Sequence, residues 1–433
     1  MSIIRKIIAD GTSETEFLKE VERRSGETDR KISEIVGDII ENVRTRGDEA
    51  VKEYTKKFDG VEAEYYEVPR EVINEALTNA DEEFTSALLS CMENITRFHN
   101  RQKEQSFIDP MENGCILGQR VRGLDRVGLY VPGGTAALSS SVLMNVVPAK
   151  IAEVGEIIMM TPPGKDGRPN PDILAAAAIA GVDRVFMAGG AQAIAALAYG
   201  TQSVPKVDKV VGPGNIFVAT AKKMVYGKVD IDSIAGPSEI LVIADETADP
   251  VYLAADLMSQ AEHDKLASAI LITTSERIAD ETIGQLEKQV EELSRKDIIK
   301  SSLGNFGAVI VVNSMEKAVS LANALAPEHL EIQVEDPMGY LGQLNNAGSV
   351  FMGQYSPEPL GDYYAGPNHI LPTGGTARFF SPLSVSSFVK RSQFIYYTRE
   401  ALMEAKKDIV TVARSEGLTA HARAVEIRFG EEE

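Results

Sequence analysis

Histidine is scarce in this chain, and its few histidines indicate where chemistry is to be sought. Only five occur among 433 residues. His263 lies three residues after Gln260, and His329 directly follows Glu328. A third, His421, lies in a polar run near the C-terminus. Imidazole is the side chain that most readily binds a metal or carries a proton near neutral pH. The chain is therefore predicted to be an enzyme with its site near these residues.

A metal site is one interpretation of the first pair. Gln260 and His263 come at the end of a helix predicted over 250–260, and their spacing places both on one face. Two ligands on one face can hold a single metal ion. The alternative is a histidine that merely ends a helix, and the pair alone does not decide between the two.

A carboxylate that suits a metal occurs in the turn-rich segment 361–369, GDYYAGPNH. Asp362 is expected on a loop between scaffold elements, where hard or borderline metals find oxygen ligands. An aspartate that only stabilises its own turn is the alternative interpretation.

Glu328 and His329 are a candidate acid/base pair. They follow Pro327 after a helix predicted over 315–325. Two adjacent titratable groups can serve one substrate as acid and base. Their spacing is equally compatible with a surface contact at a helix end.

Three glycine-rich turns stand before helices or between strands, at 131–135, 212–215 and 236–239. Glycine lets the backbone approach a ligand, and a helix N-terminus offers its amides to phosphate. None of the three reads G-x-G-x-x-G, so the usual dinucleotide fingerprint is missing.

Composition limits the class of protein. The net charge of −20 argues against nucleic acid or an anionic membrane as a partner, because either would repel this surface. Two cysteines provide no disulfide framework, which fits a reducing compartment. The longest apolar stretch, 173–182, is about half of what a membrane span requires. We predict a soluble cytoplasmic protein.

The pattern of apolar residues predicts helices over the first hundred residues, including one long helix over 72–98. Strands and helices then alternate, which is typical of parallel sheets covered by helices. Predicted strands lie at 116–121, 127–131, 156–160, 184–187, 209–211, 240–243, 269–273, 308–312 and 331–334. Helix signals return at 400–413 and 419–429.

The predicted fold is α/β, with two incomplete Rossmann-like domains and helical extensions at both ends. Two alternating runs, near 126–230 and 236–353, have similar size and order, so an old duplication is one hypothesis. The predicted domains are a helical region with lead-in strands at 1–125, two α/β domains at 126–235 and 236–380, and a helical tail at 381–433.

Five motifs in a fixed order make the chain resemble the histidinol dehydrogenase family over essentially its whole length. They are YVPGG at 130–134, GPGN at 212–215, AGPSE at 235–239, QAEH at 260–263 and PEHL at 327–330. The resemblance implies a zinc-dependent, NAD-linked oxidation of L-histidinol through histidinal to histidine, the last step of histidine biosynthesis. It also implies a homodimer whose active sites are shared across the interface.

The resemblance further implies roles for individual residues. Glu328 and His329 would be the acid/base pair, and Tyr130, Gln192 and Asn215 would contact NAD. The zinc ligands would be Gln260, His263, Asp362 and His421. The substrate would be surrounded by Ser238, His329, Glu416 and these four ligands.

Three other functions are alternatives to this one. A dehydrogenase of the same fold could act on another small polar alcohol. A zinc hydrolase could use Glu328 to activate water without binding NAD. A metal-binding protein without catalysis is disfavoured by the intact motifs.

Overall fold

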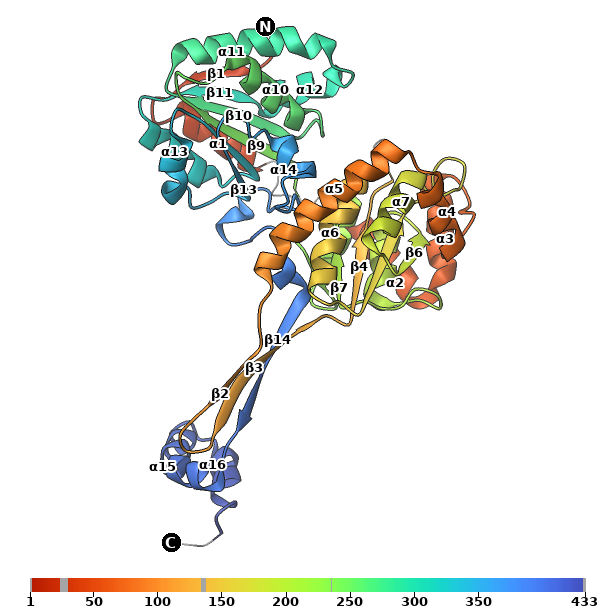
Figure 1. Cartoon of the computed structure of the whole chain (residues 1–433), viewed down its shortest axis with the longest axis vertical. Coiled ribbons are helices and arrows are strands. Elements are labelled where there is room, and N and C mark those ends of the chain that lie inside the picture. Colours follow the sequence, from red (N-terminus) through yellow and green to blue (C-terminus); the bar gives the residue numbers. More distant parts are fainter. Residues whose placement is uncertain (1, 24–29, 134–137, 235, 431–433) are drawn as a thin grey trace. The chain divides into compact units, whose positions relative to one another are not determined.

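The computed structural model describes residues 2–23, 30–133, 138–234 and 236–430 (Figure 1). The chain forms two compact units. The first comprises Met1–Gln102 and Leu124–Phe388, and the second comprises Lys103–Gly123 and Val389–Glu433. None of the described helices has the length and hydrophobicity that a membrane span requires.

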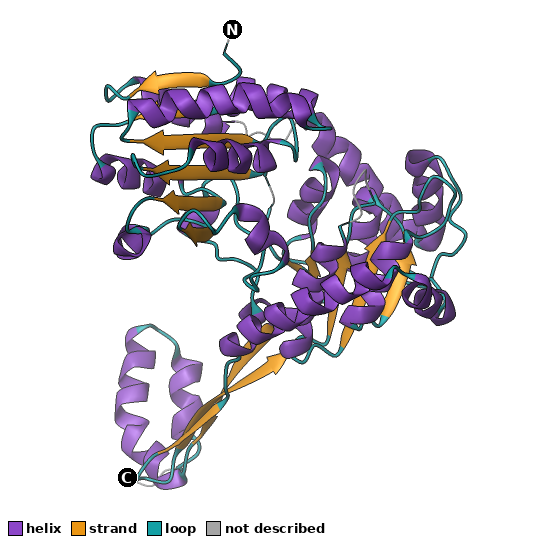
Figure 2. Ribbon diagram, turned by 45° about the horizontal axis from the view of Figure 1, so that its top comes forward, coloured by secondary structure: helices purple, strands orange, loops and turns teal. Residues whose placement is uncertain are grey.

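A five-stranded parallel sheet forms the centre of the first half of the large unit. Its strand order is β6-β5-β4-β7-β8. The strands are β4 (Arg126–Tyr130), β5 (Glu156–Thr161), β6 (Arg184–Met187), β7 (Lys209–Val211) and β8 (Asp230–Ile231). The connecting helices are α6 (Ser139–Ile151), α7 (Pro171–Ala180), α8 (Gly190–Tyr199) and α9 (Ile216–Val225). Because helices cover both faces (Figure 2), the inner strands β4, β5 and β7 are mostly apolar after their charged first residues.

A six-stranded parallel sheet forms the centre of the other half, in the order β1-β11-β10-β9-β12-β13 (Figure 2). The strands are β1 (Arg5–Ile8), β9 (Glu239–Ala244), β10 (Ser268–Thr273), β11 (Ala308–Val311), β12 (His329–Gln333) and β13 (Ser349–Met352). The helices are α10 (Pro250–Ala261), α11 (Glu276–Gln289), α12 (Lys296–Phe306), α13 (Met315–Leu325) and the short α14 (Glu358–Tyr363). The predicted α/β class with two parallel sheets is confirmed.

The two sheets repeat one strand order. If β1 at the edge is set aside, each sheet places its third, second, first, fourth and fifth strands side by side in that sequence. Both therefore have a switch point between the first and fourth strands, where ligands of open α/β sheets commonly bind. This shared order supports the hypothesis of duplication.

The N-terminal region departs from the prediction in two respects. Its start is not helical, because β1 pairs in parallel with β11. The long helix predicted over 72–98 is two helices, since the Asp81 side chain accepts a hydrogen bond from the Phe84 amide and begins a new helix. The helices of this region are α1 (Ser13–Arg23), α2 (Arg30–Arg46), α3 (Asp48–Asp59), α4 (Arg70–Asn79) and α5 (Glu82–His99).

Helices α2 and α3 contribute to the core of the first sheet. Val36, Ile39 and Val51 are buried against α8 and the strands. This packing brings residues of the N-terminal region to the first sheet, which sequence periodicity does not predict.

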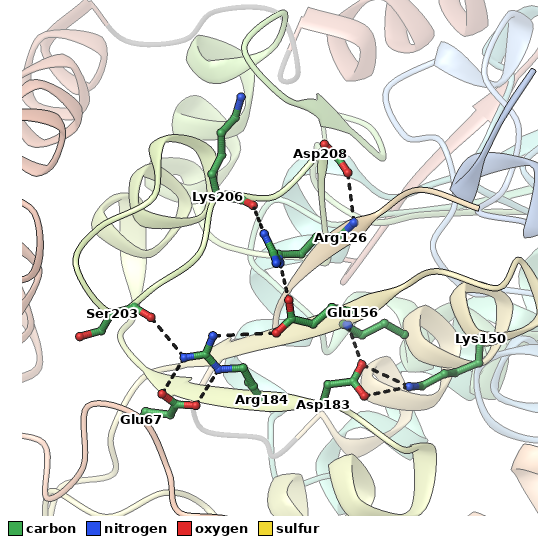
Figure 3. A network of polar contacts seen from close by, with 10 residues as sticks. Glu67, Arg126, Lys150, Glu156, Asp183, Arg184, Ser203, Lys206 and Asp208 are labelled. Carbon is green, nitrogen blue, oxygen red and sulfur yellow. Dashed lines mark hydrogen bonds and ion pairs between the residues drawn. The ribbon is translucent and has the colours of Figure 1, made fainter. Parts of the chain in front are cut away.

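A network of ion pairs joins the amino ends of β4, β5 and β6 (Figure 3). Glu156 binds Arg126 and lies 3.8 Å from Arg184, which also holds Glu67 through two hydrogen bonds of 2.7 Å. The network fixes one edge of the first sheet. The carboxyl ends of the strands, where ligands of open parallel sheets commonly bind, lie at the opposite end of this sheet.

The second unit contains a three-stranded antiparallel sheet and two helices. The strands β2 (Phe107–Pro110), β3 (Ile116–Gly123) and β14 (Val389–Tyr396) lie in the order β14-β3-β2. Helices α15 (Arg399–Ser415) and α16 (Thr419–Glu426) follow. The sequence predicts a helical tail at 381–433 with helices at 400–413 and 419–429, but a strand, β14, precedes these helices. Its residues are mostly exposed, so they lack the apolar alternation by which a half-buried strand is recognised. The predicted domain boundaries remain predictions.

Candidate active site

A cavity of about 260 Å³ lies within the large unit, between the two sheets. Gly212 follows β7 at the carboxyl edge of the first sheet, whereas Ser238 and His329 lie at the amino ends of β9 and β12. Six of the residues predicted for the site line this one cavity: Ser238, Gln260, His263, Glu328, His329 and Asp362.

The Gln260 side chain is buried without a partner. It has no exposed surface, and neither its amide nitrogen nor its amide oxygen has a hydrogen-bond partner among the described residues. Leaving a buried amide without hydrogen bonds costs about 1–3 kcal/mol, so we expect a ligand to bind the Gln260 amide. Helix α10 ends at Ala261, and His263 lies in the following turn, where its amide donates to the Gln260 carbonyl at 3.2 Å.

Three side chains at the cavity could hold a metal ion. The ligand atoms of His263, Glu358 and Asp362 all lie within 4.8 Å of one another. The carboxylates come from α14, where a spacing of four residues places them on one face. Asp362 is therefore on a short helix, and its predicted place on a loop is wrong. Glu358, enclosed by two prolines, was not predicted for the site.

The electrostatics of this cluster favour a cation. Burial, and next the negative charge of Asp362, raise the pKa of Glu358 to about 10. A positive ion between the carboxyl groups would favour their ionised forms. Nitrogen and oxygen donors of this kind suit zinc, so the histidine, the two carboxylates and the unpartnered Gln260 amide fit such an ion.

His329 has one bound and one free ring nitrogen. Its Nδ1 lies 3.0 Å from the Glu239 carbonyl oxygen, which can only accept, so Nδ1 carries the proton. Nε2 has no hydrogen-bond partner among the described residues and lies 3.8 Å from Glu358 Oε1. Burial lowers the pKa of the ring, which keeps it neutral. A neutral imidazole with a free lone pair in a cavity can act as a base.

Glu328 is held by the same residue of β9. Its Oε2 accepts a hydrogen bond of 2.9 Å from the Glu239 amide and lies 3.7 Å from His329 Nδ1. Helix α13 ends at Leu325, its C-cap residue Ala326 adopts a left-handed conformation with φ of 53°, and the chain then enters β12. The parallel pairing of β12 with β9 thus positions both members of the predicted pair.

A buried cluster of three polar side chains, Asp256, Glu331 and Gln333, holds the start of α14. Gln333 Nε2 donates to Asp256 Oδ2 at 2.6 Å and to Glu331 Oε2 at 2.8 Å. Glu331 in turn accepts a hydrogen bond of 2.9 Å from the backbone amide of Glu358. Burial, with Asp256 as the next cause, raises the pKa of Glu331 well above its usual value. The cluster fixes the position at which Glu358 enters the helix.

His369 was also absent from the predicted site. It lines the cavity, with Nε2 3.3 Å from Ser141 Oγ and Nδ1 3.0 Å from the Asp362 carbonyl oxygen. Its presence in the segment 361–369 was visible in the sequence, but nothing in the spacing distinguished it from a turn residue.

The residues predicted to contact NAD line a second cavity of the large unit, of about 580 Å³. The Tyr130 hydroxyl accepts a hydrogen bond of 3.1 Å from the Gly190 amide. Asn215 caps α9, and Gln192 is buried with an unpartnered amide oxygen among the described residues. Gly134, Thr135 and Ala235 of the glycine-rich motifs lie outside the described residues.

Glu416 and His421 belong to the second unit. Glu416 follows α15, His421 lies on α16, and both are exposed. The five other predicted ligand and substrate residues line the cavity of the first unit: Ser238, Gln260, His263, His329 and Asp362.

Comparison with known proteins shows the family. The sequence model of the histidinol dehydrogenase family matches residues 22–429 of this chain. The chain is 56% identical to the histidinol dehydrogenase of Clostridium acetobutylicum over 430 residues, which are 99% of this chain and 100% of that protein. This chain belongs to the histidinol dehydrogenase family. The histidinol dehydrogenase of Listeria innocua is 57% identical over 98% of this chain and 99% of its own.

The fold agrees with that of a solved member of the family. The crystal structure of histidinol dehydrogenase from Elizabethkingia anophelis matches with a TM-score of 0.93 and 38% identity, over 99% of this chain and 98% of that one. Histidinol dehydrogenases are NAD-dependent oxidoreductases that use zinc. The predicted family, enzyme class and cofactors are confirmed.

Proposed function

We propose that this chain oxidises L-histidinol to L-histidine through L-histidinal, with two NAD reduced and one water consumed, as the last step of histidine biosynthesis. The observation that carries the proposal is the free Nε2 of His329. It lies in the cavity that also contains Glu328 and the cluster His263, Glu358 and Asp362. The names of the Clostridium and Listeria relatives support the same substrate.

Zinc would be held by Gln260, His263 and Asp362, with His421 as a fourth ligand. Bound there, zinc supplies a positive charge that holds and orients the imidazole and amine of the substrate. Ser238 at the cavity wall and Glu416 of the second unit would contact the same substrate. Nitrogen and oxygen donors, together with an unpartnered buried amide, support this assignment.

His329 removes the hydroxyl proton of the alcohol in the first oxidation, as hydride leaves the carbon. Its Nε2 is suited to this because Nδ1 is already committed to the Glu239 carbonyl. The NAD that accepts the hydride would be held by Tyr130, Gln192 and Asn215 in the second cavity. NAD supplies only the hydride acceptor, so every proton must be moved by the protein or by water.

Glu328 activates the water that adds to histidinal. Its carboxylate accepts the water proton while the water oxygen bonds to the aldehyde carbon. His329 returns the proton that it took from the alcohol to the aldehyde oxygen, which completes the hydrate and frees Nε2 again. His329 then removes a hydroxyl proton from the hydrate as the second hydride leaves, and the resulting carboxylic acid loses its proton to water to give the carboxylate. The hydrogen bond from the Glu239 amide to Glu328 holds the Glu328 carboxylate next to His329 in both half-reactions.

The functional form would be a cytoplasmic homodimer with shared active sites. A tail of about fifty residues has too little apolar surface to fold alone, so it must dock on a larger body. In the proposed dimer, that body is a second copy of the chain, and each tail brings Glu416 and His421 to its neighbour's cavity. The two cysteines, both free, suit a reducing compartment.

A substrate panel tests the function. Purified protein with zinc and NAD is offered histidinol and other small polar alcohols, and NADH formation is followed by absorbance. The proposal expects histidinol to be strongly preferred. Preference for another alcohol would reassign the substrate, and absence of NADH with every alcohol would favour a hydrolase.

A further inference from the structure

The cavity lined by Tyr130 and Gln192 is also lined by an acidic residue that was not predicted for any site. Asp59 is the one charged side chain among the described residues that line it. The residue ends α3, which packs on α8 and so brings the carboxyl group beside Gly189. A Cβ built on Gly189 would lie 3.7 Å from Asp59 Oδ1.

The Asp59 carboxyl group is unfavourably placed for folding. Its Oδ2 is buried and has no hydrogen-bond partner among the described residues. The residue also ends a helix, where the macrodipole disfavours negative charge. Burial raises its pKa to about 6, so the group is still ionised at neutral pH. A carboxylate kept at such a place against these costs is expected to bind something.

The position of the cavity shows which half of a dinucleotide it would take. Gly212, which lines the cavity of His329, is so close to Tyr130 that an added Cβ would lie 2.0 Å from the Tyr130 carbonyl oxygen. The two cavities therefore meet at the switch point of the first sheet, between β4 and β7. Because hydride is transferred at His329, the nicotinamide must extend toward that cavity, and the adenosine half remains in this one.

The walls of the cavity match the parts of an adenosine diphosphate. Ile35, Phe58 and Phe217 are apolar, yet they are exposed by 46%, 51% and 36%, and they line it. They offer a surface for the adenine ring. Gly189 is the N-cap of α8, which begins at Gly190. The Gly190 amide donates to Tyr130, and the amides that follow it in the first turn can receive a phosphate. The remaining polar part of the nucleotide is the ribose, for which Asp59 provides an acceptor.

The first sheet lacks the acid that usually binds this ribose. In Rossmann domains an Asp or Glu at the end of the second strand accepts the ribose hydroxyls. Here the second strand, β5, ends at Thr161 and is followed by Pro162 and Pro163. Pro162 lines the cavity but cannot accept through its side chain.

We propose that Asp59 accepts the hydroxyls of the adenosine ribose of NAD and thereby selects NAD over NADP. This carboxylate, which belongs to α3 of the N-terminal region, takes the place of the acid that is missing at the end of β5. A 2′-phosphate would meet this negative charge with no described basic side chain in the cavity to offset it. The inference rests on the proposed function, because it takes NAD as the ligand.

Nucleotide binding without substrate tests the inference. NADH and NADPH are titrated by fluorescence at pH 8 into the zinc-loaded full chain, its Asp59→Asn variant and an Asp38→Asn control. Asp38 is exposed on α2 and does not line the cavity, so the control makes the same change of charge elsewhere. Asparagine has nearly the shape of aspartate and removes a buried charge, so the variant should fold.

The wild type and the control are expected to bind NADH at least tenfold more tightly than NADPH. In Asp59→Asn, the Kd for NADH should rise about tenfold, as expected for loss of charge-assisted hydrogen bonds, and the preference over NADPH should largely disappear. Unchanged NADH binding or unchanged preference in Asp59→Asn would overturn this inference alone. Binding of neither nucleotide by the wild type would overturn the proposed function as well.

Discussion

His329 Nδ1 lies 3.0 Å from the carbonyl oxygen of Glu239, and this contact decides which nitrogen of the ring faces the substrate. The pairing of β12 with β9 places His329 opposite Ile240. Glu239, which precedes Ile240 in β9, therefore lies adjacent to His329. The backbone of Glu239 also donates to Glu328. One residue of a buried strand thus orients both members of the acid/base pair.

Replacement of His329 by asparagine should impair both oxidations. Asparagine can still donate to the Glu239 carbonyl but cannot take a proton, so each half-reaction should slow by about 10²–10⁴-fold. The two steps are measured separately, with histidinol and with histidinal as the starting substrate. Full activity with histidinal would show that another group serves as base in the second step.

Glu328→Gln should separate the two oxidations. Glutamine retains an acceptor for the Glu239 amide but is a poor base, so histidinol should still be oxidised while histidinal fails to react further. Single-turnover analysis of the intermediate and product provides the measurement. If Glu328→Gln and His329→Asn lose the first step equally, the proposed division of labour is wrong.

Mixing two inactive variants should restore activity when their subunits exchange. In a mixed dimer of His263→Ala and His421→Ala, one cavity lacks both residues and the other has both. With shared sites, each mixed dimer should show about half of the wild-type activity. If exchange is proven by differently tagged subunits and activity does not return, His421 serves the cavity of its own chain.

Asp59→Asn should stabilise the protein at high pH. The folded pKa of Asp59, about 6, lies above the ordinary value of 3.8, so the ionised carboxylate is disfavoured by folding. This cost is complete above pH 6 and disappears as the pH falls toward 4. Discounted for partial exposure, the gain at pH 8 should be about 1 kcal/mol.

Urea unfolding at pH 8 and pH 4, without nucleotide, measures this gain. The Asp38→Asn control should show no comparable pH-dependent difference. A loss of stability in Asp59→Asn at pH 8 would mean that the carboxylate has a structural partner.

Sequence reasoning succeeded where local pattern and chemistry coincide. The alternation of apolar strands and helices predicted two parallel sheets, and it follows from burial of the strands on both faces. Gln260, His263, Glu328 and His329 were found through their motifs, and the structure places them around one cavity.

The residues that were missed depend on tertiary packing. Glu358 stands between two prolines and reaches the cavity only because Glu331 and its buried neighbours hold the start of α14. Asp59 belongs to an amphipathic helix far from the glycine turns in sequence, and it reaches Tyr130 because α3 packs on α8. Neither packing relationship has a signal in local spacing.

The yield of NADH per histidinol consumed tests the central claim most directly. With limiting histidinol, excess NAD and the zinc-loaded protein, four-electron oxidation predicts two NADH for each histidinol, with histidine as the product. A yield of one NADH, with histidinal accumulating, would contradict the account and define a simple alcohol dehydrogenase.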